Sequence, residues 1–195
     1  AIGTDTLRRV ESVRGTNFDD TYDATGFSGS STNAGSFGTF NDFEGVGGND
    51  IIIGNGNTQI VFFNATAGVT VDLAAGTATG NASVGTDTIL GGVSRVRGSN
   101  FSDTITGDGS NNILDGRTGD DTLTGGGGKD TFVFAPGSGK DTITDITLGD
   151  PLLNPEADLI DLSALGYHNV SELTIVDNGQ GFARIVFEPN DWIDL

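Results

Sequence analysis

The feature that most constrains the fold is a nine-residue unit that recurs between residues 98 and 144. Aligned on glycine, the units are GSNFSDTIT at 98–106, GDGSNNILD at 107–115, GRTGDDTLT at 116–124, GGGGKDTFV at 125–133 and, after two extra residues, PGSGKDTIT at 136–144. Six turn-forming residues followed by three strand-forming residues make one side of a flattened coil, so two units complete a turn of about 18 residues. The unit therefore predicts an all-β fold built from stacked parallel strands.

The eighth position of each unit carries an apolar residue, and these residues are Ile105, Leu114, Leu123, Phe132 and Ile143. Strands of successive turns stack at about 4.8 Å, and alternate residues of a strand point to opposite faces. We therefore expect the eighth positions to point inward and to form a continuous apolar core.

The sixth position carries an acidic or amide side chain in every unit. Asp103 is predicted to face Asp121, and Asp121 to face Asp141 once the two extra residues are absorbed as a bulge. On the other side of the coil, Asn112 is predicted to face Asp130. Carboxylates this close together destabilise a folded chain unless a cation lies between them.

Calcium fits this arrangement better than magnesium does. It accepts six to eight oxygen ligands at about 2.3–2.6 Å, from carboxylates and backbone carbonyls, whereas magnesium requires near-ideal octahedral geometry. Glycine in the turns permits the positive φ angles that aim carbonyls at an ion. The predicted metal-site residues are Asp103, Asn112, Asp121, Asp130, Asp141 and Asp50, with the turn glycines Gly98, Gly107, Gly116, Gly119, Gly125 and Gly128.

Degenerate copies of the unit lie upstream. GVGGNDIII at 45–53 places Asp50 at the sixth position, and GTNFDDTYD at 15–23 places Asp20 there. Asp20 has no partner unit 18 residues away. Asn112 replaces an aspartate, and GNGNTQIVF at 54–62 carries Gln59 at the sixth position, so weaker or empty sites are expected at Asn112 and Gln59. A longer repeat overlies these units, because the segment that starts at Gly3 resembles the one that starts at Gly85.

These repeats resemble the RTX, or hemolysin-type, calcium-binding repeats of the form GGxGxDxUx. The resemblance covers 98–144 strongly, 45–53 moderately and 15–23 as a single unit. It implies a parallel β-roll that binds several calcium ions, calcium-triggered folding outside the cell, and export through a type I secretion channel. The longer repeat resembles segments of very large repeat proteins and adhesins.

The charge of the chain limits its partners. Its formal net charge is −18, with 27 acidic against 9 basic residues, so nucleic acid and an anionic membrane surface would repel it. The chain has no cysteine, which excludes disulfides and thiolate metal sites. No apolar run approaches the roughly 20 residues that span a bilayer. The expected partners are calcium ions, with self-association or a cell-surface partner in addition.

We predict no enzymatic activity. The single histidine, His168, excludes an HExxH zinc site, and no GxSxG nucleophile elbow is present. The lysines of GGGGKDT and GSGKDT are followed by aspartate, not by the serine or threonine of a phosphate-binding loop.

The predicted organisation is a degenerate repeat-related β region at 1–97, the calcium-binding β-roll at 98–144 and a C-terminal cap at 145–195. The loop-rich first part is expected to contain a flexible loop at 27–41 and a hairpin at 60–73 that turns around Asn64–Gly68. The cap is expected to contain a hairpin that turns through Asn178–Gly181.

The predicted function is calcium binding that drives folding of a secreted roll within a larger exported repeat protein or adhesin. Two alternatives are an accessory module of a secreted lipase, protease or epimerase, and a self-associating element of a filament or surface layer.

Overall fold

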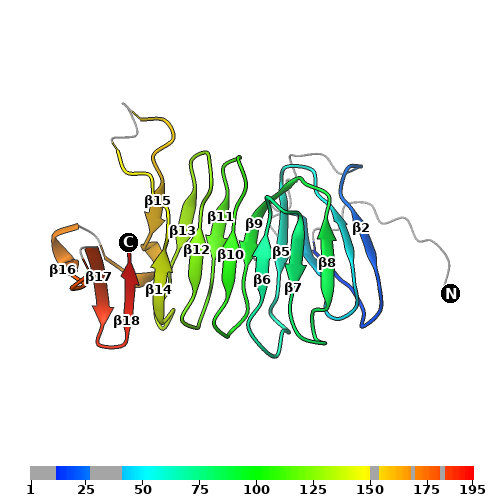
Figure 1. Ribbon diagram of the computed structural model, residues 1–195, viewed down its shortest axis with the longest axis horizontal. Coiled ribbons are helices and arrows are strands. Elements are labelled where there is room, and N and C mark those ends of the chain that lie inside the picture. Colours follow the sequence, from blue (N-terminus) through cyan, green and yellow to red (C-terminus); the bar gives the residue numbers. More distant parts are fainter. Residues whose placement is uncertain (1–11, 27–40, 150–153, 168–169, 181–182) are drawn as a thin grey trace.

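A computed structural model describes residues 12–26, 41–149, 154–167, 170–180 and 183–195. Their strands form two sheets, and the strands of each sheet follow one another along the long axis of the molecule. Strand β2 lies near one end, and the strands that precede the C-terminus lie at the other (Figure 1). Sheet A contains, in order, β1 (Ser12–Arg14), β3 (Asn41–Glu44), β5 (Thr58–Val61), β9 (Val93–Arg97), β11 (Ile113–Asp115), β13 (Thr131–Val133) and β15 (Leu159–Asp161).

Sheet B is longer and contains, in order, β16 (Thr174–Asp177), β17 (Ala183–Glu188), β18 (Asp191–Asp194), β14 (Lys140–Ile143), β12 (Thr122–Thr124), β10 (Thr104–Thr106), β6 (Thr70–Asp72), β7 (Thr77–Thr79), β8 (Thr86–Ile89), β4 (Ile51–Ile53) and β2 (Thr21–Asp23). Through the repeats the chain alternates between the sheets, one strand to each.

The strand register follows the nine-residue unit. Ile105 pairs with Leu123 in parallel, and Leu123 pairs with Ile143, so the two extra residues are absorbed without a shift in the apolar column. On sheet A, Leu114 pairs with Phe132 in the same way. The predicted all-β, parallel β-roll is therefore confirmed.

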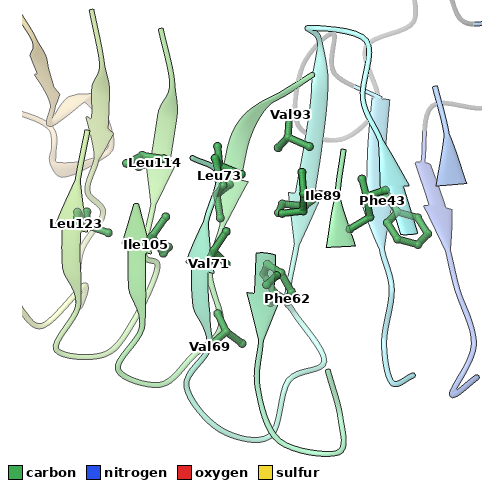
Figure 2. Packing of buried hydrophobic residues seen from close by; sticks show 14 of the residues in the cluster. Phe43, Phe62, Val69, Val71, Leu73, Ile89, Val93, Ile105, Leu114 and Leu123 are labelled. Atoms are coloured by element: carbon green, nitrogen blue, oxygen red, sulfur yellow. The ribbon is translucent and has the colours of Figure 1, made fainter. Parts of the chain in front are cut away.

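The core lies between the two sheets. The eighth-position side chains are buried, and Figure 2 shows Ile105, Leu114 and Leu123 directed into the space between the strands. The same core continues toward the N-terminal end through Val71 and Phe43, among other residues, so sheet pairing and packing are continuous beyond the regular repeats.

Strands β6, β7 and β8 form an antiparallel insertion within sheet B. Strand β6 pairs with β10 on one side, β8 pairs with β4 on the other, and β7 joins them. The predicted hairpin around Asn64–Gly68 is wrong, because β5 lies in sheet A and β6 in sheet B. Alternating apolar residues mark strands that face the core, but they do not distinguish pairing in one sheet from crossing to the facing sheet.

The C-terminal strands complete both sheets. Strand β15 pairs with β13, and β18 pairs with β14 in parallel. Strands β16 and β17 pair antiparallel, which confirms the hairpin predicted through Asn178–Gly181, although Gly181 itself lies outside the described residues. Two short 3₁₀ helices, Ser163–Leu165 and Val170–Glu172, lie between β15 and β16.

Three features of the sequence lie outside the described residues: His168, most of the loop predicted at 27–41, and the start of the longer repeat at Gly3. Within the described ranges, no helix has the length and apolar character needed to cross a membrane.

Candidate metal sites

The sixth-position side chains are buried where each turn meets its strand. Each of the predicted side-chain ligands is 3% exposed or less: Asp50, Asp103, Asn112, Asp121, Asp130 and Asp141. Residues two apart in a strand point to the same face, so the sixth side chain points inward when the eighth side chain does. The repeat therefore places a polar side chain beneath each turn, at the edge of the apolar core.

A ladder of hydrogen bonds joins these residues across successive turns. The backbone N–H of Asp103 donates to Oδ1 of Asp121 (2.8 Å), and that of Asp121 donates to Oδ1 of Asp141 (2.9 Å). On the other side of the roll, the N–H of Asn112 donates to Oδ1 of Asp130 (2.8 Å). The structure thus brings together the three predicted pairs, and in each the acceptor belongs to the turn that comes later in the chain.

The ladder extends into the N-terminal part of the roll. The N–H of Asp20 donates to Oδ1 of Asp50 (2.8 Å), and the N–H of Asp50 donates to Oδ1 of Asp87 (3.0 Å). The expectation that Asp20 lacks a stacked neighbour is therefore wrong. Its neighbour is 30 residues away because the intervening connection is longer than in the regular repeats.

Three aspartates in the ladder were not predicted from the sequence. Besides Asp87, Asp158 accepts from the N–H of Asp130 (2.8 Å), and Asp191 accepts from the N–H groups of Gly137 and Gly139. None of the three occurs in a nine-residue unit, but each precedes an isoleucine by two positions. An Asp-x-Ile pattern at strand starts is the signal that could have identified them.

Three turns are closed by hydrogen bonds within the turn. In the turn at 98–103, Ser99 donates from its N–H to Oδ2 of Asp103 (2.6 Å) and from its hydroxyl to Oδ1 (2.7 Å). The turn at 15–20 is similar, because the N–H of Thr16 donates to Oδ2 of Asp20 (2.7 Å). In the turn at 107–112, the N–H of Asp108 donates to Oδ1 of Asn112 (2.8 Å). We call these three the closed turns.

Four other turns have a different backbone. Their second and fourth residues both have positive φ, and the pairs are Val46 and Gly48, Arg117 and Gly119, Gly126 and Gly128, and Gly137 and Gly139. We call these the open turns. Val46 (φ 71°) and Arg117 (φ 74°) are uncommon in this region, and a β-branched residue there is strained. Such strain persists where the surrounding structure requires it, and it is concentrated at functional sites.

Each open turn contains a carboxylate oxygen without a partner. Among the described residues, the buried Oδ2 atoms without a hydrogen-bond partner are those of Asp50, Asp121, Asp130 and Asp141. These are the sixth-position residues of the four open turns. Because a buried, unpaired polar atom is costly, a ligand is needed at each open turn.

Among the open turns of the 98–144 segment, two have a glycine at the first position, which makes room for this carboxylate. A Cβ atom at Gly116 would contact Oδ2 of Asp121, and a Cβ at Gly125 would contact Oδ2 of Asp130. In these two turns the carboxylate therefore folds back under the turn, in the space that the glycine leaves.

Comparison with known protein families identifies the four turns between residues 98 and 130. Residues 97–132 match the model of the RTX calcium-binding nonapeptide repeat, in four copies. The chain carries RTX calcium-binding repeats. Such repeats bind several calcium ions per array, which confirms the predicted cofactor. A comparison with curated protein sequences gives no match.

Burial disfavours the ionised form of the sixth-position carboxylates. Burial, together with repulsion from Asp141 and Asp103, raises the pKa of Asp121 to about 7, against the lowering effect of the hydrogen bond from the N–H of Asp103. Burial likewise raises the pKa of Asp130 and of Asp141 to about 6. A bound cation would supply positive charge beside these carboxylates and so stabilise their ionised form.

The donor set of the open turns fits calcium. In the described part of the chain, no three His, Cys, Asp or Glu side chains cluster closely enough to hold a metal by side chains alone. Backbone carbonyls would therefore have to complete the ligand set. The carbonyl of Gly119 lies between neighbouring turns, where it packs against Gly139 of the next turn. A mixture of carboxylate and carbonyl oxygens is the ligand set that calcium prefers.

Proposed function

We propose that calcium binding at the open turns drives the folding of this β-roll outside the cell, within a larger exported repeat protein or adhesin. The observation that carries this proposal is the coincidence of positive φ angles with an unpartnered carboxylate oxygen in the four open turns. The cation compensates buried charge that otherwise opposes folding.

We assign the ligands on the same basis. Asp121, Asp130, Asp141 and Asp50 supply unpartnered oxygens, and Gly116, Gly119, Gly125 and Gly128 shape two of their turns. Asp103 and Asn112 accept hydrogen bonds from the N–H groups of Ser99 and Asp108, within the closed turns that begin at Gly98 and Gly107, and so are weaker ligands.

We propose that the chain is organised in the three segments predicted from the sequence. Residues 98–144 are the main calcium-binding segment, 1–97 a related β region, and 145–195 a cap that covers the end of the stack. The pairing of β18 with β14 supports the role of the cap. We propose a non-catalytic role for the chain, since the family that matches is a calcium-binding repeat.

The experiment is a calcium titration of chelator-treated protein, followed by circular dichroism. The strand signal should rise cooperatively between about 10⁻⁴ and 10⁻³ M calcium, the range of extracellular calcium modules. A chelated sample with the same spectrum and melting temperature as the calcium-loaded sample would refute the proposal.

Self-association is a second candidate function, which one observation favours. Strand β16 is the edge of sheet B, and its Ile175 and Val176 are 54% and 44% exposed. An exposed apolar edge strand can pair with another chain. Sedimentation velocity with and without calcium tests this function, and an Ile175→Lys variant should lower any oligomer to the monomer.

A further inference from the structure

The open turn at 45–50 lies outside the matched RTX repeats and has the same features as the two open turns within them, at 116–121 and 125–130. Its second and fourth residues, Val46 and Gly48, have φ angles of 71° and 119°. Asp50 is 1% exposed, and within the described ranges its Oδ2 has no hydrogen-bond partner. A Cβ at Gly45 would contact this oxygen, so the carboxylate is folded under the turn.

The turn that faces it comes from the antiparallel insertion. This turn, residues 81–87, joins β7 to β8 and has no nine-residue frame. It provides a second buried carboxylate, that of Asp87, whose Oδ1 accepts from the N–H of Asp50 (3.0 Å). The N–H of Thr86 donates to the side-chain oxygen of Asn49 (2.9 Å), which fixes the two turns against each other.

Backbone carbonyls complete the interface between the two turns. The carbonyl of Gly48 packs against Gly85, which has a φ of 84°, and a Cβ at Gly85 would overlap that oxygen. The carbonyl of Ala82 packs against Gly47 from the other side. The interface therefore holds these carbonyls and the carboxylate of Asp87, and beside it, under the turn at 45–50, lies the unpartnered Oδ2 of Asp50, whose Oδ1 accepts from the N–H of Asp20 on the opposite side. Carboxylate and carbonyl oxygens are a ligand set that suits calcium.

We infer that a further calcium site lies between the turns at 45–50 and 81–87, with Asp50 and Asp87 as its carboxylate ligands. The inference rests on the proposed function, since it assigns to calcium the same unpartnered oxygen as in the RTX repeats. It differs in that one half of the site comes from a turn that is not a repeat. The bound ion joins the β6–β8 insertion to the N-terminal strands of the roll.

Hydrogen exchange of the unmodified full chain, with calcium and with chelator, tests the inference without any variant. The amides of β4 and β8 should become more protected in calcium, as should those of β12 in the RTX repeats. If β12 responds and β4 and β8 do not, the inference fails, and the proposed function stands for the open turns at 116–121, 125–130 and 136–141. If none of these strands responds, both fail.

Calcium stoichiometry, measured by equilibrium dialysis with calcium itself, provides the second test. Asp50→Asn and Asp87→Asn should each bind one calcium ion fewer than the unmodified chain. The matched control is Asp23→Asn, which removes the same charge from an exposed residue of the neighbouring strand and should bind the full number. An unchanged count in both Asp50→Asn and Asp87→Asn would overturn the inference.

Discussion

The dependence of stability on calcium concentration should report the number of open turns directly. A ligand that binds only the folded chain stabilises it by RT ln(1 + [L]/Kd), so above Kd each tenfold rise in calcium adds about 1.4 kcal/mol per ion. The structure has an unpartnered carboxylate oxygen at Asp50, Asp121, Asp130 and Asp141. With one ion for each oxygen, the free energy of unfolding should rise by about 5.5 kcal/mol per tenfold calcium.

Asp121→Asn should remove one ion from this slope. The asparagine keeps the shape and the acceptor for the N–H of Asp103, but it loses the negative charge that the ion requires. The slope should fall by about 1.4 kcal/mol, to about 4 kcal/mol per tenfold calcium. Asp120→Asn is the matched control, because it removes the same charge from the adjacent, exposed residue. Asp20→Asn, in a closed turn, should also leave the slope unchanged.

The assay is urea unfolding at a series of calcium concentrations above Kd. Circular dichroism and the fluorescence of Trp192 should give coincident transitions, since a single free energy of unfolding requires two-state behaviour. A slope of about 1.4 kcal/mol or less for the unmodified chain would show that a single ion accounts for the effect. Equal slopes for Asp120→Asn and Asp121→Asn would refute the assignment of the ion to the open turn.

Three other perturbations have defined outcomes. Ser99→Ala removes the hydroxyl that closes its turn, so it should destabilise the chain by about 1–3 kcal/mol in urea unfolding, equally at each calcium concentration above Kd. A loss that grows with calcium concentration would contradict a closed turn. The pKa of Asp121 is raised to about 7, so a bound proton can compensate its buried carboxylate when calcium is absent. In chelator, the strand signal in circular dichroism should therefore be strongest near pH 4 and fall as the pH rises through 7. A flat profile would show that the carboxylate is already compensated. Leu123→Ala, at a fully buried core position, should cost about 2–5 kcal/mol by urea unfolding, while Thr122→Ala should cost less than about 1 kcal/mol.

The sequence predicts most of the regular roll because the repeat period sets the strand register. Once Ile105 and Leu123 occupy equivalent positions in successive turns, parallel stacking and the pairing of Asp103 with Asp121 follow. The same logic fails where spacing is irregular. The ladder needs only an aspartate two positions before an inward apolar residue, so Asp87 and Asp158 join it at spacings that no period predicts.

The difference between open and closed turns is only partly visible in the sequence. Serine or threonine at the second position favours a turn closed by its own hydroxyl and amide, as at Ser99 and Thr16. Propensity does not predict that Val46 and Arg117 adopt positive φ, because both residue types disfavour it. Their conformation is imposed by the stack on either side of the turn.

The one-way direction of the ladder sets a rule for where such a roll can be interrupted. At the sixth position the earlier turn donates its N–H to the later turn in each bond, so a foreign segment must offer there an acceptor to the turn it follows and a donor to the turn it precedes. The β6–β8 insertion meets both conditions, since Asp87 accepts from Asp50 and the N–H of Val69 donates to Asp103 (2.8 Å). A segment inserted with the donor and the acceptor in the opposite order would leave a buried N–H group and a buried carboxylate oxygen unpaired at its two junctions. Recombination between such rolls should therefore succeed mainly where this donor–acceptor order is preserved.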